Sequence, residues 1–254
     1  MNVKKIILLL YVLIFLGSKS VYSQVINIES KRFLNDTSGW VGRTDTYFSI
    51  TQNTQQVISL GNSVHIQYAK HEHKFLILND INFVKAGPTD FVNSGYQHFR
   101  YSYKINKLIT WETFLQAQYN AVMKMKGRFL AGTGPRIRVV KREDFKMYAA
   151  ALYMYEYEEI VNTPVIVNSA NRISSYVTFT WTITKNVEFS STTFYQPNLA
   201  NFSDYRVAGD GAFEIGITKK LSFRINYNFL YDTKQPVGIP NFVYSVKNGL
   251  TFKF

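Results

Sequence analysis

The feature that most constrains the fold is the alternation of apolar and polar residues at the end of the chain, in residues 242–254. One face of this stretch carries Phe242, Tyr244, Val246, Leu250, Phe252 and Phe254, and Asn248 interrupts the series. The opposite face is mostly polar. A strand of this length with apolar residues in its middle, aromatic residues at both ends and a polar opposite face is typical of a tilted strand in a transmembrane barrel.

The same period-two pattern recurs along most of the chain, in segments separated by turn residues. About twelve such segments predict an all-β fold, a closed antiparallel transmembrane β-barrel of about 12 strands. The expected strands span residues 40–51, 56–68, 74–84, 94–105, 109–121, 128–140, 145–156, 172–183, 187–197, 205–217, 221–232 and 242–254.

Charged residues within these segments fall on one face of each expected strand. In residues 205–217, Arg206, Asp210 and Glu214 share one register, and Val207 and Phe213 share the other. A charge that faces lipid at the bilayer midplane costs about 2–4 kcal/mol, whereas a charge that faces a wet interior costs little. A soluble sandwich would place its charges on the outer face, and its strands usually run for only about five or six residues. The sorting therefore favours the membrane barrel.

The first 23 residues have the pattern of an export signal, since two lysines precede an apolar run that is too short to cross a bilayer as a helix. We expect cleavage after Ser23, with an uncleaved anchor as the rival reading. Residues 24–37 are then a periplasmic segment, and residues 38–254 form the barrel in the outer membrane of a Gram-negative envelope. The chain has no cysteine, which excludes disulfides and cysteine-based metal sites.

Connection lengths predict an orientation. The junctions 106–108, 184–186 and 218–220 are short, whereas 85–93, 157–171, 198–204 and 233–241 are longer. Outer-membrane barrels place short turns in the periplasm and long loops outside, so both termini should be periplasmic. The turn at 218–220 should pair Arg206 with Asp232 and Glu214 with Arg224, and the turn at 106–108 should set Arg100 diagonally to Glu112.

The inward-facing charges form the candidate site. Basic residues outnumber acidic ones on this face, which would suit a narrow lumen that favours small anionic solutes, because unpaired Arg and Lys rings select anions in pores. The competing interpretation is a plugged interior in which the same charges pair. Export makes nucleic acid an unsuitable partner. The expected lumen-facing charges are Arg43, Asp45, Arg100, Lys104, Glu112, Arg128, Arg136, Arg138, Arg172, Glu188, Arg206, Asp210, Glu214, Arg224, Asp232, Lys247 and Lys253.

Catalytic and metal sites are weakly indicated. Ser63 and His65 share one strand face, which leaves a phospholipase-like, lipid-modifying enzyme as an alternative function, although in that enzyme class the histidine comes first and faces lipid. His71 and His73 flank Glu72 in an expected turn that would need a further ligand to hold a metal. We expect His98 to be hydrogen-bonded on the inward face. No cofactor is predicted, and the glycines of residues 132–134 are expected to mark a bend or bulge.

Taken together, the opening Gly39-Trp40-Val41-Gly42, the mid-chain Gly132-Thr133-Gly134 and the finish from Lys220-Leu221-Ser222 to Phe254 resemble a family of uncharacterised outer-membrane barrels labelled salt-induced outer membrane proteins. The resemblance implies an integral outer-membrane barrel and no established activity. The final strand also resembles the signal by which the barrel assembly machinery recognises its substrates, and that signal would comprise Phe242, Tyr244, Phe252 and Phe254. We expect Asn248 to meet a partner chain or to lie at a register break.

Overall fold

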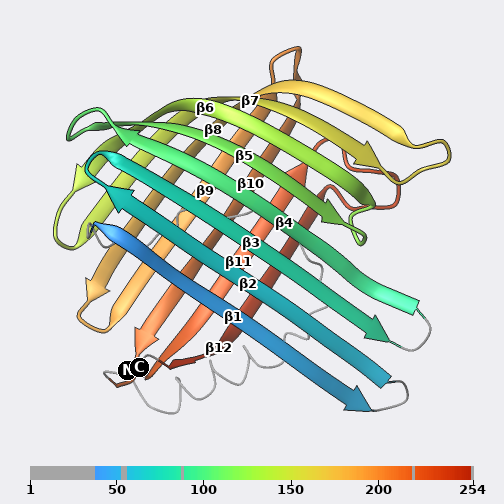
Figure 1. Cartoon of the computed structure of the whole chain (residues 1–254), viewed down its shortest axis with the longest axis horizontal. Coiled ribbons are helices and arrows are strands. Elements are labelled where there is room, and N and C mark those ends of the chain that lie inside the picture. The colour runs from blue at the N-terminus through green and yellow to red at the C-terminus, as the bar shows by residue number, and fades with distance from the viewer. Residues whose placement is uncertain (1–37, 53–55, 87–88, 219–220, 253–254) are drawn as a thin grey trace, which may run out of the picture.

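The computed structural model describes residues 38–52, 56–86, 89–218 and 221–252, which form one antiparallel sheet of twelve strands in sequence order (Figure 1). The expected signal peptide and the segment 24–37 lie outside the described residues. The strands are β1 Gly39–Gln52, β2 Gln56–Lys70, β3 His73–Ala86, β4 Thr89–Lys104, β5 Ile109–Asn120, β6 Met125–Lys141, β7 Phe145–Ile160, β8 Ile166–Thr184, β9 Val187–Asn198, β10 Asn201–Gly216, β11 Leu221–Asp232 and β12 Phe242–Phe252.

The sheet is strongly curved, and β9 to β12 pass behind the first strands in the view of Figure 1. Each strand pairs with its neighbour in sequence, from β1 with β2 to β11 with β12. Among the described residues no strand pairing joins β1 to β12, so this part of the sheet is open between its first and last strands. The all-β antiparallel class and the twelve expected strands are confirmed. Within this part of the chain, no helix is long and apolar enough to cross a membrane.

In three of the four connections that were expected to be long, most of the residues belong to strands instead. β7 continues to Ile160 and β8 begins at Ile166, and the gaps after β3 and β9 shrink to two residues each. The reason is that backbone pairing does not require an apolar face: Glu158 pairs with Asn168 and Ile160 with Ile166 in an unbroken register. Only residues 233–241 remain long among the four. The predicted orientation of the termini, which depended on these lengths, stays a prediction.

The predicted registers are confirmed. Arg206 pairs with Asp232 and Glu214 with Arg224 between β10 and β11, and Arg100 lies diagonal to Glu112 between β4 and β5. The short turn after β10 is set by two backbone bonds, in which the amides of Ile217 and Thr218 donate to the carbonyl of Leu221 over 2.8 and 2.9 Å. Turn length therefore determined which side chains face each other.

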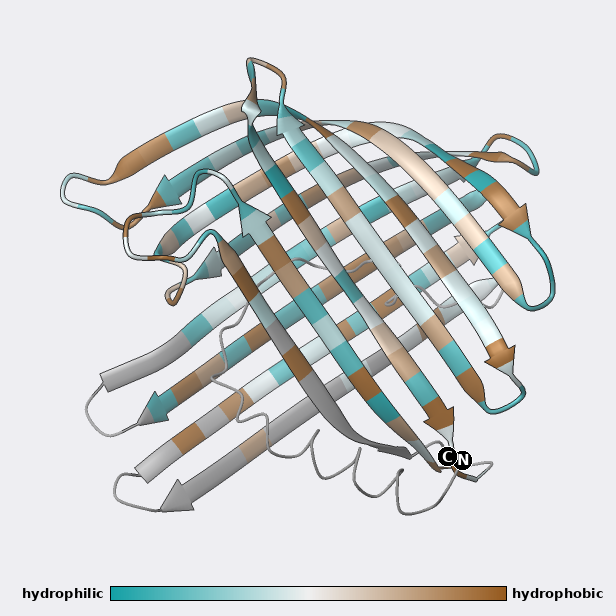
Figure 2. Cartoon of the chain, turned by 180° about the vertical axis from the view of Figure 1, so that it is seen from behind, coloured by the Kyte–Doolittle hydropathy of each residue, from teal (hydrophilic) through white to brown (hydrophobic). Residues whose placement is uncertain are grey.

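Alternation separates an apolar outer face from a mixed inner face, and Figure 2 shows the resulting bands of hydrophilic and hydrophobic residues along the strands. On β5, the outward side chain of Leu115 is 56% exposed, whereas Glu112, three residues earlier and on the opposite face, is fully buried. The large exposed apolar side chains include Trp40, Phe48, Ile77, Phe99, Trp111, Leu115, Phe129, Ile137, Tyr153, Val177, Trp181, Tyr195, Phe242 and Tyr244. The apolar surface is therefore on the outside of the sheet, the reverse of a soluble protein.

An apolar cluster, here called the interior core, also fills part of the inner face. Side chains from β5 to β12 contribute to it, and Ile239 from the connection between β11 and β12 packs against it. Its members are Phe114, Met123, Met125, Ala150, Leu152, Met154, Tyr176, Phe194, Ala208, Leu230 and Val243. Apolar side chains of the described residues thus pack against one another on the inside of the curved sheet at this level.

The glycines of residues 132–134 were expected to mark a bend or a bulge, and the structure rules out the bulge. The β5–β6 register runs through them without a shift. The irregularities in the pairing of β6 lie elsewhere, between Gln118 and Asn120 on β5 and, on β6, between Met125 and Gly127 and between Arg138 and Val140. Glycine is needed for close approach instead. A Cβ on Gly132 would lie 2.5 Å from the Phe114 ring, and a Cβ on Gly134 would lie 2.5 Å from the carbonyl oxygen of Ala151.

Asn248 pairs with Ile225 in a continuous β11–β12 register, so the register break proposed for it is wrong on this side of the strand. Its side chain lies outside the described features, as do those of Phe252 and Lys247. Lys253 and Phe254 lie outside the described residues altogether. Phe242 and Tyr244, the other two expected members of the assembly signal, are exposed on the outer face.

Candidate functional site

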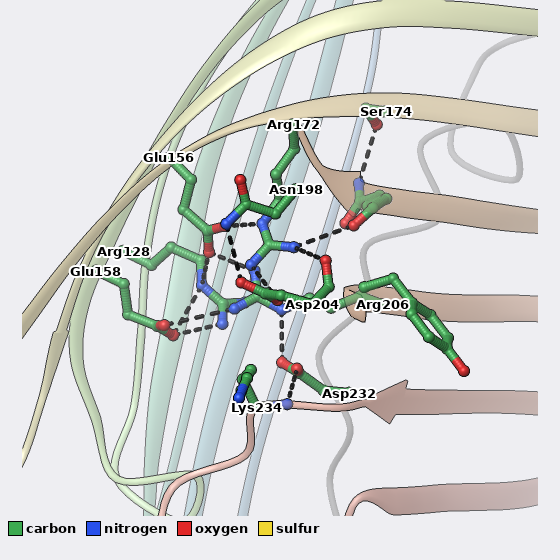
Figure 3. A network of polar contacts seen from close by, with 12 residues as sticks. Arg128, Glu156, Glu158, Arg172, Ser174, Asn198, Asp204, Arg206, Asp232 and Lys234 are labelled. Carbon is green, nitrogen blue, oxygen red and sulfur yellow. Dashed lines mark hydrogen bonds and ion pairs between the residues drawn. The ribbon is translucent and has the colours of Figure 1, made fainter. Parts of the chain in front are cut away.

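The densest group of charges lies inside the curved sheet toward the end at which β11 and β12 are joined (Figure 3). We call it the charge network. It contains three arginines and four carboxylates from five strands, β6, β7, β8, β10 and β11: Arg128, Glu156, Glu158, Arg172, Asp204, Arg206 and Asp232.

Glu156 is the centre of the charge network and contacts all three of its arginines. Arg172 Nε lies 2.6 Å from Glu156 Oε2, Arg128 Nε lies 3.1 Å from Oε1, and Arg206 also contacts Oε1. Glu156 itself is 2% exposed. A buried carboxylate is tolerated only when it is paired and hydrogen-bonded, and three guanidinium groups meet this requirement.

The arginines extend the charge network to the other strands. Arg206 Nε donates to Asp232 Oδ2 over 2.5 Å, and its Nη2 lies 3.4 Å from Glu158. Arg172 Nη2 donates to Asp204 Oδ1 over 2.9 Å, and Arg128 contacts Glu158. Charges on strands that are not hydrogen-bonded neighbours, such as β7 and β10, are therefore tied together across the interior.

A cap covers the same end of the molecule. It consists of the β5–β6 turn, residues 121–124, and the β11–β12 connection, residues 233–241. Lys124 Nζ in the turn donates to the carbonyl of Val237 in the connection over 2.8 Å, and Met123 and Ile239 join the interior core. The charge network thus lies beneath a structured cover.

A second polar cluster lies on β4, β5 and β8. Arg100 Nη1 donates to Glu112 Oε2 over 2.5 Å, and the hydroxyl of Tyr176 donates to the same oxygen over 3.0 Å. His98 is hydrogen-bonded to Gln116 over 2.9 Å and receives a 3.3 Å bond from Arg100 Nε, as expected for a satisfied interior histidine. The tyrosine bond reaches from β8 to β5, so this cluster also crosses the interior.

At the opposite end, near the β2–β3, β4–β5 and β6–β7 turns, the inner face opens into a cavity of about 370 Å³. Seven basic side chains line it, and Glu72 is the acidic residue among its described lining residues. We call this cavity the basic vestibule; its basic residues are Lys74, Lys104, Lys107, Arg136, Arg138, Lys141 and Lys146.

The structure distributes the expected lumen-facing charges among three environments. Buried ones lie in the charge network or the second cluster: Arg100, Glu112, Arg128, Arg172, Arg206 and Asp232. Half-buried ones are Arg136, Arg138, Asp210, Glu214 and Arg224, and exposed ones near strand ends are Lys104 and Glu188. The side chains of Arg43 and Asp45 lie outside the described features.

Sequence reasoning found Asp232 but missed the other three carboxylates of the charge network, Glu156, Glu158 and Asp204. The expected strand 145–156 has Glu156 at its last position, and Glu158 falls in the expected connection 157–171. Both continue the inward register of Leu152 and Met154, so extending the alternation by two more steps would have found them. It also missed Lys141 and Lys146 of the basic vestibule, which lie at the ends of two strands where no apolar partner marks the inward face.

The weaker candidates have local explanations. Ser63 Oγ lies 3.0 Å from His65 Nε2, and His65 is buried on the inner face. His73 Nδ1 is hydrogen-bonded to the Tyr101 hydroxyl over 2.7 Å across the β3–β4 pair. Among the described residues no group of three or more His, Cys, Asp or Glu side chains could hold a metal ion.

Comparison with known proteins places the fold in context. Residues 35–254 match a family described as a protein of unknown function, DUF481. No curated protein matches the chain. The family description mentions neither an activity nor salt, so the salt-induced label stays a prediction.

Three solved porin structures are similar to the chain. A NanC porin structure is 11% identical, with a TM-score of 0.49, and covers 84% of this chain and 99% of its own. A KdgM porin and a KdgM porin in complex with disordered oligogalacturonate are each 10% identical over the same shares, with TM-scores of 0.43 and 0.44. At TM-scores below 0.5 these similarities carry no argument about this chain.

Proposed function

The chain belongs to the DUF481 family of proteins of unknown function, and on that premise we propose that it is an integral outer-membrane barrel with a sealed interior and a non-enzymatic role in the envelope. The apolar outer face supports the membrane location. Residues such as Trp111, Leu115 and Phe129 are 43–56% exposed on neighbouring strands, and a continuous apolar surface of this kind requires lipid or a partner to cover it.

The packed interior is the observation that carries the sealed barrel. Leu152 and Met154 are each 1% exposed in the interior core, between the charge network on one side and the Arg100–Glu112 cluster on the other. The three arginines of the charge network form ion pairs with its four carboxylates. They are therefore not a ring of unpaired charges of the kind that selects ions in a pore.

Closure of the barrel, the processing site after Ser23 and the periplasmic position of both termini belong to the same proposal. In it, β12 closes the sheet against β1 and presents Phe242 and Tyr244 to the barrel assembly machinery and then to lipid. The exposure of both aromatic side chains on the outer face supports this role.

Two measurements on the folded, full-length protein test the proposal. A closed barrel should migrate faster on a denaturing gel when unheated than when boiled, and a sample with no such shift would contradict closure. In planar bilayers the same sample should show no single-channel steps. Regular conductance steps from a sample with the heat-dependent shift would replace the sealed barrel by a channel.

A narrow, anion-leaning channel is the second candidate, and the basic vestibule is the observation that favours it. Solute would have to pass the charge network, so conduction would require its ion pairs to separate. An enzymatic role has less support, because the Ser63–His65 pair is on the inner face, away from the lipid that a phospholipase must reach.

A further inference from the structure

Basic side chains greatly outnumber acidic ones among the described residues that line the basic vestibule. Seven basic side chains and one acidic side chain line one cavity of about 370 Å³. The charge network at the other end shows the contrast, since three arginines there meet four carboxylates. Walls of low dielectric focus the field of such an imbalance and concentrate small ions of the opposite sign.

The backbone holds two of these cations against each other. Lys141 on β6 and Lys146 on β7 are directly opposite in the strand register, and both line the cavity. Like charges in this position destabilise a strand pair. An anion between them would reverse the sign of that contribution.

Two arginines lie deeper in the cavity. Arg138 Nε is buried and makes no hydrogen bond among the described residues. The guanidinium of Arg136 stacks on the ring of Tyr148 at 3.7 Å, and its Nε forms a long ion pair with Glu112 Oε1 at 3.9 Å. Stacking fixes the guanidinium plane, and a fixed fork is suited to bidentate binding of phosphate or carboxylate.

Hydroxyl groups also line the cavity. Thr178 and Thr192 are buried, are hydrogen-bonded to each other over 2.7 Å and line the cavity together with Ser190. The cavity volume lies at the lower end of the range of small-molecule sites, about 300–1,000 Å³, which suits a compact solute. Neither the Arg100–Glu112 pair nor any member of the interior core is among the residues that line the cavity.

We propose that the basic vestibule is a dead-end binding site for a small soluble molecule that carries at least two phosphate or carboxylate groups. Arg136 and Arg138 bind one anionic group, and Lys141 and Lys146 neutralise a second one near the mouth. The dead end rests on the sealed interior proposed above, whereas binding itself does not. The molecule therefore enters and leaves at the same end of the sheet, where β1 begins and β12 ends.

Calorimetric titration of the full-length protein in zwitterionic detergent tests binding, with pyrophosphate and citrate as probes and chloride as the competing ion. We expect saturable binding of at least one probe, weakened about tenfold or more between 20 and 200 mM salt because exposed charges are screened over a Debye length of about 8 Å at physiological ionic strength. No binding of either probe to folded protein at low salt would overturn the proposal.

Matched variants locate the site. Arg138→Gln should lower the affinity about tenfold or more, whereas Lys126→Gln, which removes one positive charge at the opposite end of β6, should change it less than about twofold. Equal losses would show attraction to net charge and overturn the site. Lys104→Gln, at an exposed position of the cavity, provides a second variant if Arg138→Gln does not fold.

A third arm separates a soluble ligand from a lipid headgroup with the same chemistry. A short-chain phosphatidic acid should compete with pyrophosphate no better than inorganic phosphate does, and preferential binding of the lipid would overturn the soluble ligand. The same two measurements, conductance and probe binding, distinguish an error in the proposed function from an error in the proposed site. Conductance steps with intact probe binding would remove only the dead end, and absent binding in a non-conducting barrel would remove only the site.

Discussion

Replacing Arg206 by methionine tests how the charge network contributes to stability. Methionine keeps most of the length of the side chain but removes the guanidinium that contacts Glu156, Glu158 and Asp232. Those three carboxylates would stay in the interior, and the two arginines left in the charge network, Arg128 and Arg172, would face four carboxylates.

The expected loss is large because the site is buried. Arg206 is 5% exposed and Asp232 is 2% exposed. Removal of one partner from a buried ion pair typically costs about 3–5 kcal/mol, since the other charge is left without compensation. We therefore expect the free energy of unfolding of Arg206→Met to fall by about 3–5 kcal/mol, which is more than a hundredfold change in the folding equilibrium.

The same strand pair supplies the control. Arg224 pairs with Glu214 across β10 and β11, but the two groups are 3.7 Å apart and the arginine side chain is 34% exposed. Such a pair contributes about 0–1 kcal/mol. Arg224→Met should therefore lose about 3 kcal/mol less stability than Arg206→Met, although both variants remove an arginine that faces a carboxylate in one register.

Equilibrium unfolding in urea, with protein refolded into lipid vesicles, measures both losses. Tryptophan fluorescence and the fraction of heat-shifted band should give the same transition. A loss below about 1 kcal/mol for Arg206→Met, or equal losses for the two variants, would refute the view that burial makes the charge network structural. Adding Asp232→Asn to Arg206→Met should recover part of the loss, because one fewer carboxylate is left unpaired.

Three further predictions test the packing, the outer face and the enzyme alternative. Gly134→Ala should cost about 1–3 kcal/mol, because the new Cβ would lie 2.5 Å from the carbonyl oxygen of Ala151 and backbone would have to shift; the same urea titration measures it. Leu115→Lys should reduce stability in vesicles by about 2–4 kcal/mol if this outward side chain faces the bilayer core. His65→Ala and the unmodified protein should both show no hydrolysis of phospholipid in a fatty-acid release assay.

Controls for these variants come from the same chain. Gly42→Ala, whose Cβ would have its nearest neighbour at 3.4 Å, should change stability by less than about 0.5 kcal/mol. Leu108→Lys, in the β4–β5 turn, should be similarly mild. A cost for Leu115→Lys no greater than that for Leu108→Lys would contradict a lipid-facing position, and hydrolysis that His65→Ala abolishes would restore the enzyme.

The strands and their registers were predictable because two simple signals agree. Alternation locates each strand, and a short turn fixes which residues are opposite, so Arg206–Asp232 and Arg100–Glu112 follow from counting across a turn. The extent of the strands was less predictable. Residues 157–160 and 166–171 are polar enough to suggest a loop, but the backbone ladder continues through them.

The division of the interior could not be read from the sequence. Arg128 and Arg138 have the same residue type and the same inward register on one strand, yet Arg128 pairs with two glutamates and Arg138 Nε has no hydrogen bond among the described residues. The difference comes from strands that are adjacent only after the sheet curves, such as β7 and β10. Counting inward charges therefore gives the sign of the net charge but does not show where basic side chains outnumber acidic ones.

The cross-interior ion pairs also impose an order on assembly. Every strand pairs with its neighbour in sequence, so the sheet can grow one hairpin at a time through contacts of short sequence separation. Glu156 and Arg206 are 50 residues apart and can meet only after the sheet has curled around them. The ion pairs of the charge network therefore form late in folding. A chain that has formed all its hairpins but has not curled still has separated, hydrated charges on its inner face.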